Sequence, residues 1–183
     1  MDEKRTVKAS KFLSLVLRHE PERIGVALDE GGWVDVGALL AACAAHGRPL
    51  TRAELDHVVA TNNKRRFAFS EDGRRIRASQ GHTVAVELGL APAVPPDVLF
   101  HGTATATLPL ILRDGLLPMA RQDVHLSADR ETAVRVGARH GRPVVLAVDA
   151  AGLAAAGQVF RVSANGVWLT GPVAPEWLRQ RAD

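Results

Sequence analysis

The chain is poor in the residues that form crosslinks, stack on bases or enter membranes. It has a single cysteine in 183 residues, which excludes a disulfide within the chain and fits a reducing, cytoplasmic location. Tyrosine is absent and aromatic residues make up only 4%, which argues against an aromatic platform for single-stranded bases. Runs of about 18 apolar residues, which a transmembrane helix needs, are missing, and so is an apolar N-terminal signal region. We therefore expect neither a membrane-spanning nor a secreted protein.

Two common kinds of ligand-binding motif are also missing. Neither Gly-x-Gly-x-x-Gly nor Gly-x-x-x-x-Gly-Lys occurs in the sequence, so neither a Rossmann site nor a P-loop is predicted. The seven histidines are dispersed and show no metal-ligand spacing, so no metal is expected.

What the chain does contain is a localised positive charge. Apolar residues make up 46% and charged residues 23%, as in globular proteins, and the net charge is only +3. Between Lys64 and Arg77, however, six Lys/Arg face two acidic residues, a net of +4. This stretch either neutralises the phosphates of a nucleic acid or is the solvated edge of a hairpin. The isoelectric point of about 9.6 also favours anionic partners.

A proline-rich segment divides the sequence. Gly89–Asp97 carries three prolines within five residues, which neither a helix nor a central strand can accommodate. This predicts an N-terminal lobe over residues 1–90, a linker near 90–96 and a second lobe over 97–183.

The first lobe has the pattern of three helices and a hairpin. Helices are expected near Val7–Leu17, over Val36–Ala45, and from a capping box at Thr51 to about Thr61. Arg66–Ser70 and Arg74–Ala78 flank a Glu-Asp-Gly turn and predict a β-hairpin. This order predicts a winged helix with the basic hairpin as its wing.

The second lobe alternates short strands with two helices. A short strand at Val98–Phe100 should lead into His101-Gly102-Thr103, and Ser127 should cap a helix that runs to His140. The other expected elements are a helix at Thr107–Arg113 and strands at Val124–Leu126, Val144–Val148, Val159–Val162 and Val167–Thr170. The whole chain is therefore predicted to be α+β.

Basic side chains occur in four patches flanked by apolar residues: Leu17–His19, Lys64–Phe67, Gln80–His82 and Met119–Gln122. Arginine offers a rigid fork of donors to phosphate, and histidine can carry a proton near neutral pH. The patches form either a pocket for a multiply charged anion or four unrelated solvated surfaces. Arg18 and His19 could also simply complement the dipole at the end of the first helix.

Eight motifs in order favour the pocket. They are Ser10–His19, Asp29–Val36, Asn63–Phe67, Ala78–His82, His101–Thr103, Val124–Ser127, Val136–Gly141 and Asn165–Leu169. In sequence and spacing this set strongly resembles the NAD-dependent RNA 2′-phosphotransferase family, which removes a splice-junction 2′-phosphate from tRNA. The resemblance runs from about Ser10 to Trp177.

The resemblance implies a fold and a reaction. The second lobe would be an ADP-ribosyltransferase-like mixed sheet that holds NAD as co-substrate. The RNA 2′-phosphate would attack NAD and release nicotinamide, giving an RNA-2′-phospho-ADP-ribose intermediate. The ribose 2″-hydroxyl would then attack the phosphate, releasing 2′-OH RNA and ADP-ribose 1″,2″-cyclic phosphate.

The resemblance also implies roles for individual residues. A catalytic tetrad would consist of Arg18, His19, Arg66 and Arg121. The residues expected to contact NAD are His101, Gly102, Thr103, Ser127, Arg139 and His140. Those expected to contact RNA are Lys64, Arg65, Gln80 and His82, although Gln80–His82 could equally be a polar turn.

One position departs from the family. Asp123 stands where the family usually has a histidine, and a carboxylate there could pair with Arg121 or repel phosphate. Two other functions stay open: ADP-ribosylation of nucleic-acid 5′-phosphate ends, and a winged-helix nucleic-acid binder without catalysis.

Overall fold

The chain separates into two compact units, Met1–Gly89 and Leu90–Asp183. The computed structural model describes residues 1–180, so the last three residues of the expected second lobe lie outside the described residues. The expected linker, residues 90–96, belongs to the second unit. Within the described residues no helix is both long and apolar enough to cross a membrane.

The first unit contains the three expected helices: α1 (Glu3–Val16), α2 (Val36–Ala45) and α3 (Arg52–Ala60). Its antiparallel sheet has the order β1-β3-β2, with β1 at Val34–Asp35, β2 at Phe67–Phe69 and β3 at Arg75–Ala78. A 3₁₀ turn, η1 (Pro21–Ile24), follows α1. The hairpin and all three helices were predicted, whereas β1 was not.

Capping explains where the helices begin. Asp2 and Asp35 accept hydrogen bonds from the first turns of α1 and α2. Thr51 and Glu54 form the expected capping box at the start of α3. These side chains satisfy backbone N–H groups that have no partner within the helix.

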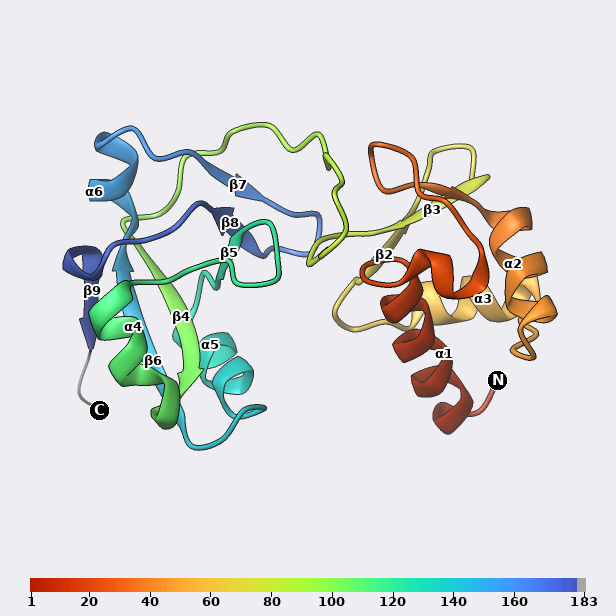
Figure 1. Cartoon of the computed structure of the whole chain (residues 1–183), viewed down its shortest axis with the longest axis horizontal. Coiled ribbons are helices and arrows are strands. Elements are labelled where there is room, and N and C mark those ends of the chain that lie inside the picture. The colour runs from red at the N-terminus through yellow and green to blue at the C-terminus, as the bar shows by residue number, and fades with distance from the viewer. Residues whose placement is uncertain (181–183) are drawn as a thin grey trace. The chain divides into compact units, whose positions relative to one another are not determined.

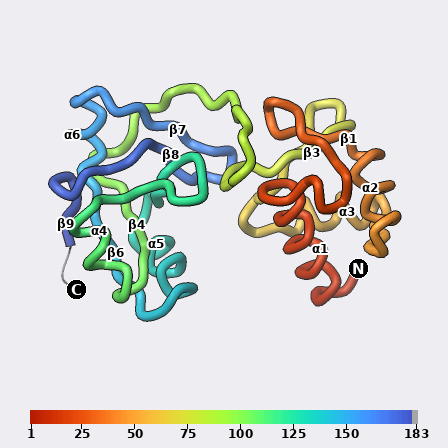
Figure 2. The backbone as a smooth tube through the Cα atoms, in the orientation of Figure 1, coloured from red at the N-terminus to blue at the C-terminus, as the bar shows by residue number. Residues whose placement is uncertain are grey.

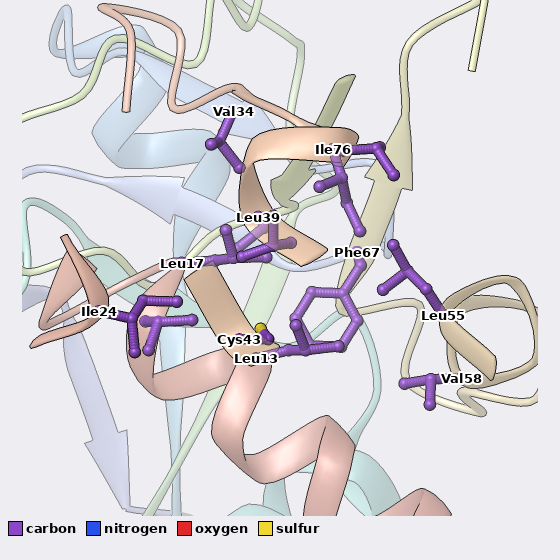
Figure 3. Close-up of a cluster of buried hydrophobic side chains, with 13 residues drawn as sticks. Leu13, Leu17, Ile24, Val34, Leu39, Cys43, Leu55, Val58, Phe67 and Ile76 are labelled. Carbon is purple, nitrogen blue, oxygen red and sulfur yellow. The ribbon is translucent and has the colours of Figure 1, made fainter. Parts of the chain in front are cut away.

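The apolar faces of the helices meet over the sheet. Leu13 of α1 and Leu17, which follows its last residue, pack with Leu39, Phe67 and Ile76, as Figure 3 shows. Cys43 belongs to this core and is 1% exposed, as expected for a packing residue. Burial raises the pKa of its thiol, so it stays protonated at neutral pH.

The second unit contains two three-stranded sheets, ordered β4-β6-β9 and β5-β8-β7. All strand pairs in the described residues are antiparallel, so the mixed sheet expected here was wrong. The long strands β4 (Val98–Ala104) and β6 (Pro143–Asp149) run side by side over their full length (Figure 2). The others are β5 (Val124–Leu126), β7 (Phe160–Val162), β8 (Trp168–Thr170) and β9 (Leu178–Gln180).

Over residues 90–180, three α-helices accompany these sheets: α4 (Leu108–Asp114), α5 (Arg130–Gly137) and α6 (Ala150–Ala155). Figure 1 shows α5 beside β4. Two glycines permit this contact, because a Cβ on Gly102 would collide with the carbonyl oxygen of Ala133, and one on Gly137 would lie 2.6 Å from that of Thr103. Position 102 therefore requires a glycine, because the backbones of α5 and β4 approach each other closely there.

Three expectations for the second unit need correction. Asp129, not Ser127, caps α5, since its carboxylate accepts from Thr132 N–H while Ser127 is paired with Phe100 through its backbone. The motif His101–Thr103 lies inside β4 instead of after a short strand, because β6 pairs with all of it. A third helix, α6, was not predicted, because its run of alanine and glycine carries no amphipathic pattern.

Candidate functional site

An open pocket of about 840 Å³ lies in the first unit between α1, α3 and the α3–β2 turn. We call it the α1–α3 pocket. Glu3 contributes a carboxylate to its lining. The cationic and imidazole side chains that line it are Lys11, Arg18, His19, His57, Lys64 and Arg66. A pocket with this lining suits an anion with more than one negative charge.

Arg18 and His19 enter the pocket from the end of α1. The helix ends at Val16, and the N–H of His19 still donates to the carbonyl of Leu15 at 2.9 Å. Thr83 secures this end from a distant part of the sequence. Its N–H donates to the carbonyl of Arg18 at 2.9 Å, and its Oγ1 lies 3.1 Å from His19 Nδ1.

Arg66 enters from the α3–β2 turn and is oriented by Asn62. Its Nη1 donates to Asn62 Oδ1 at 3.2 Å, while Asn62 Nδ2 donates to Ser10 Oγ of α1 at 3.0 Å. The same Oδ1 accepts from Lys64 N–H at 3.1 Å. Asn62 therefore connects the guanidinium of Arg66, the turn and α1.

The backbone of this turn is unusual at Arg65. Its φ of 40° lies in the left-handed region, which a residue with a Cβ rarely adopts. Buried Ser79 holds the turn in place, since its Oγ donates to the carbonyl of Arg65 at 2.7 Å and its N–H to that of Arg66 at 2.8 Å. The strained turn thus delivers Lys64 and Arg66 to the same pocket.

The side chain of His82 lies near Arg18, His19 and Arg77 and is only 2% exposed. Its Nε2 is buried and has no hydrogen-bond partner in the part of the chain that the structure describes. Burial, aided by the positive charges of Arg18, His19 and Arg77, lowers the pKa of His82 to about 4. The ring is therefore neutral at pH 7.

The arginines of the basic hairpin differ in how many contacts their side chains make with the rest of the protein. Arg77 stacks on Trp33 at 4.4 Å and donates to the carbonyls of Gly31 and Leu88 at 3.2 and 3.1 Å. Burial lowers its pKa. Arg75 forms a 3.4 Å ion pair with Asp29, and Arg74 is exposed. Arg77 consequently has a packing role that its place in a basic run did not reveal.

In the second unit, His125 connects two of the expected site residues. Arg121 Nη1 lies 3.1 Å from His125 Nδ1, and the carbonyl of His125 lies 3.2 Å from His101 Nδ1. A carbonyl only accepts, so His101 carries its proton on Nδ1. Burial lowers the pKa of His101 and the charge of Arg121 acts in the same direction, while the His125 carbonyl opposes them.

The other residues expected to contact NAD occupy β4 and the ends of α5. Alternation along β4 places Gly102 toward α5 and both His101 and Thr103 on the opposite face. Thr103 is 7% exposed. Ser127 is joined to Phe100 by two backbone hydrogen bonds, and Arg139 and His140 are exposed just beyond α5.

The structure thus brings Arg18, His19, Lys64 and Arg66 into one pocket and joins His101 to Arg121 through His125. Sequence reasoning gave no roles to the residues that orient them: Asn62, Ser79, Thr83 and His125. For Asn62 a signal existed, because asparagine after a helix often starts a turn. The other contacts join distant segments or depend on strand geometry, and no local pattern announces them.

Comparison with known proteins assigns this arrangement to a family. The model of the "RNA 2′-phosphotransferase, Tpt1 / KptA family" matches residues 4–171. The chain belongs to the RNA 2′-phosphotransferase family. It is accordingly an enzyme of the transferase class.

Relatives match along almost their whole length. The chain is 64% identical to a probable RNA 2′-phosphotransferase of Streptomyces coelicolor, with 98% of this chain and 97% of the relative covered. A protein of the same description from Agrobacterium fabrum is 59% identical, with 95% and 94% covered. One from Herpetosiphon aurantiacus is 57% identical, with 97% and 98% covered. The similarity to these relatives therefore extends over both units of the chain.

Proposed function

We propose that this protein transfers an internal 2′-phosphate from RNA to NAD, leaving a 2′-hydroxyl on the RNA. The observation that carries the proposal is the convergence of Arg18, His19 and Arg66 on the α1–α3 pocket. Two guanidinium groups and an imidazole match the charge and hydrogen-bonding capacity of a phosphate monoester. The relatives' shared description names a phosphate at the RNA 2′ position as the transferred group.

In the first step, an oxygen of the RNA 2′-phosphate bonds to the anomeric carbon of the nicotinamide ribose. The bond to nicotinamide breaks, nicotinamide leaves as a neutral molecule, and RNA-2′-phospho-ADP-ribose forms. The nucleophile is already ionised, so the enzyme mainly holds it in line with the sugar. We assign this positioning to Arg18 and Arg66, with Lys64 and Arg65 as further contacts to RNA.

In the second step, the ribose 2″-hydroxyl attacks the same phosphorus and the bond to the RNA 2′-oxygen breaks. The products are 2′-OH RNA and ADP-ribose 1″,2″-cyclic phosphate. Negative charge builds on the phosphorus centre, and cationic donors stabilise it most in the transition state. We assign this stabilisation to the arginines of the tetrad, Arg121 included, and the proton transfer to His19.

NAD is assigned to the second unit. The neutral ring of His101, with Nδ1 held by the His125 carbonyl, suits a hydrogen bond to an uncharged part of the nucleotide. The exposed Arg139 and His140 suit its pyrophosphate, and Ser127 offers a hydroxyl. Gly102 helps indirectly, because close packing on α5 fixes the strand that carries His101 and Thr103.

We propose that the three helices and antiparallel sheet of the first unit form a winged helix that binds RNA, and that the second unit is an ADP-ribosyltransferase-like lobe. A tRNA-like RNA is the expected substrate. A cytoplasmic location and a reaction without metal remain predictions.

Incubation with 2′-phosphorylated RNA and NAD, followed by product analysis, tests the proposal. Nicotinamide, 2′-OH RNA and a cyclic ADP-ribose phosphate in equal amounts would support it. A stable ADP-ribose adduct on 5′-phosphate ends, with 2′-phosphates untouched, would instead show the capping reaction. RNA binding with NAD left intact would show a binder without catalysis.

A further inference from the structure

The Thr83 side chain contacts both residues that end α1. Its Oγ1 lies 3.1 Å from Nδ1 of His19 and 3.4 Å from the carbonyl oxygen of Arg18. The N–H of Thr83 donates to the same carbonyl at 2.9 Å. Both the backbone and the side chain of Thr83 therefore contact the Arg18–His19 pair.

The Thr83 hydroxyl has one hydrogen and two neighbours that could accept it, the Arg18 carbonyl and an unprotonated His19 Nδ1. A carbonyl oxygen can only accept, so the 3.4 Å contact with Arg18 is a hydrogen bond only when the Thr83 hydroxyl donates its hydrogen there. In that arrangement the hydroxyl oxygen accepts a hydrogen bond from His19, and the proton of the imidazole lies on Nδ1. In the neutral ring the lone pair then resides on Nε2.

The neighbouring residue explains how Thr83 is held. The His82 ring is almost fully buried, next to Gly32 and Val86, so it anchors the segment to the body of the first unit. Because this ring is neutral at pH 7, it adds no positive charge beside Arg18 and His19. The segment 82–83 thus supports the pair without competing for the phosphate.

We propose that Thr83 is a positioning residue that holds His19 in the Nδ1–H tautomer and makes Nε2 the base of the second step. Nε2 takes the proton of the ribose 2″-hydroxyl as the new oxygen–phosphorus bond forms. The proton ends on the departing RNA 2′-oxygen, so the imidazole is neutral again after each turnover. The assignment of this step rests on the proposed function, whereas the tautomer does not.

The tautomer can be measured without substrate. Full-length protein with ¹⁵N-labelled histidine is examined by NMR at a pH where free histidine is neutral, and the His19 signals are assigned by their loss in His19→Asn. In wild-type protein Nδ1 should show a protonated-type shift and Nε2 an unprotonated-type shift. Thr83→Val should move the proton toward Nε2, and Thr83→Ser should retain the wild-type pattern. A wild-type Nε2–H ring, or a Val variant with unchanged signals, would overturn the proposal.

Kinetics test the consequence. Thr83→Val should slow the second step by about 10- to 100-fold, because the base then carries its proton on the wrong nitrogen. RNA-2′-phospho-ADP-ribose should accumulate, as it should in His19→Ala, while KM for RNA and NAD stays within about twofold. Thr83→Ser should restore turnover, and Thr107→Val, in the other unit, serves as the matched control.

Two results would remove Thr83 from this role. One is a Val variant that turns over at the wild-type rate, and the other is a raised KM with unchanged kcat. Thr83 is exposed, so valine should be tolerated, and a urea unfolding curve checks this. If wild-type protein fails to act on 2′-phosphorylated RNA, the proposed function fails, while the histidine signals still decide the tautomer.

Discussion

Arg121 donates a hydrogen bond from Nη1 to Nδ1 of His125 across 3.1 Å. Arginine has donors only, so the imidazole must accept through an unprotonated Nδ1. The His125 carbonyl lies 3.2 Å from His101 Nδ1. One residue of β5 therefore orients both a proposed catalytic arginine and a proposed NAD contact.

The first prediction concerns this hydrogen bond. His125→Leu removes the acceptor and should lower kcat/KM by about 10- to 100-fold, the usual range for a hydrogen bond to a charged group. His125→Asn should lose less, because its side-chain oxygen can replace Nδ1. Steady-state assays with 2′-phosphorylated RNA measure both variants. Equal activity of the Leu variant and wild type would show that Arg121 needs no such orientation.

The second prediction concerns Asn62. Asn62→Ala removes one acceptor of Arg66 and should lower kcat/KM by about tenfold, because a less firmly held guanidinium binds phosphate at an entropic cost. Asn62→Asp should instead raise KM for the RNA, since the new carboxylate pairs with Arg66 and repels phosphate. Ser10→Ala, which removes only the bond from Asn62 to α1, is the milder control. If all three variants were as active as wild type, Asn62 would have no role in orienting Arg66.

The third prediction separates two kinds of arginine in the hairpin. Replacing Arg74 and Arg75 together with alanine should weaken RNA binding and flatten its salt dependence by roughly 1.4 to 1.8 logarithmic units per decade of salt. Arg77→Ala should mainly lower the free energy of unfolding, by about 2 kcal/mol, because two carbonyls lose their donor and Trp33 loses one of the two arginines over its ring. RNA binding at several salt concentrations and urea unfolding distinguish them. An unaltered salt slope in the double variant would leave the hairpin charges without a role in RNA binding.

The fourth prediction concerns acid stability. The folded-state pKa of His82 is lowered to about 4 from the ordinary 6.5, so below pH 6.5 the unfolded chain binds a proton that the folded chain does not. Stability is thus fully present above about pH 6.5 and is lost as the pH falls toward 4, by roughly 2 kcal/mol at pH 5. His101, whose pKa is also lowered, acts in the same direction.

Urea unfolding at pH 7 and pH 5 measures this effect, with His82→Gln as the comparison. The variant should lose less stability on acidification than wild type. Equal losses would mean that His82 does not remain neutral in the fold.

The elements with strong local signals were predicted well. The capping box at Thr51, the amphipathic face of α1 and the turn at Glu71–Gly73 each depend on neighbouring residues, and each predicted the right element, although α1 begins at Glu3, four residues before the expected start. Elements that depend on distant partners were missed. β1 has only two residues and exists because β3 pairs with it, and β9 likewise depends on β6.

The site shows the same division. Arg18, His19 and Arg66 stood out through their motifs, and the structure places them in one pocket. Apart from Asn62, which lies four residues from Arg66, the residues that orient them do so through contacts between segments far apart in the chain, such as Thr83 with His19. The reason for Gly102 was also hidden, since only the packed structure shows the α5 backbone against it.

The most direct test of the proposed function follows a radiolabelled 2′-phosphate on RNA. In the presence of NAD, the label should leave the RNA and appear in ADP-ribose 1″,2″-cyclic phosphate, matched by one nicotinamide per phosphate. Arg66→Ala should greatly reduce this transfer, whereas Arg23→Ala, which removes an exposed ion pair with Glu20, should leave it unchanged. Label released as inorganic phosphate, or retained on the RNA while NAD stays intact, would contradict transfer to NAD.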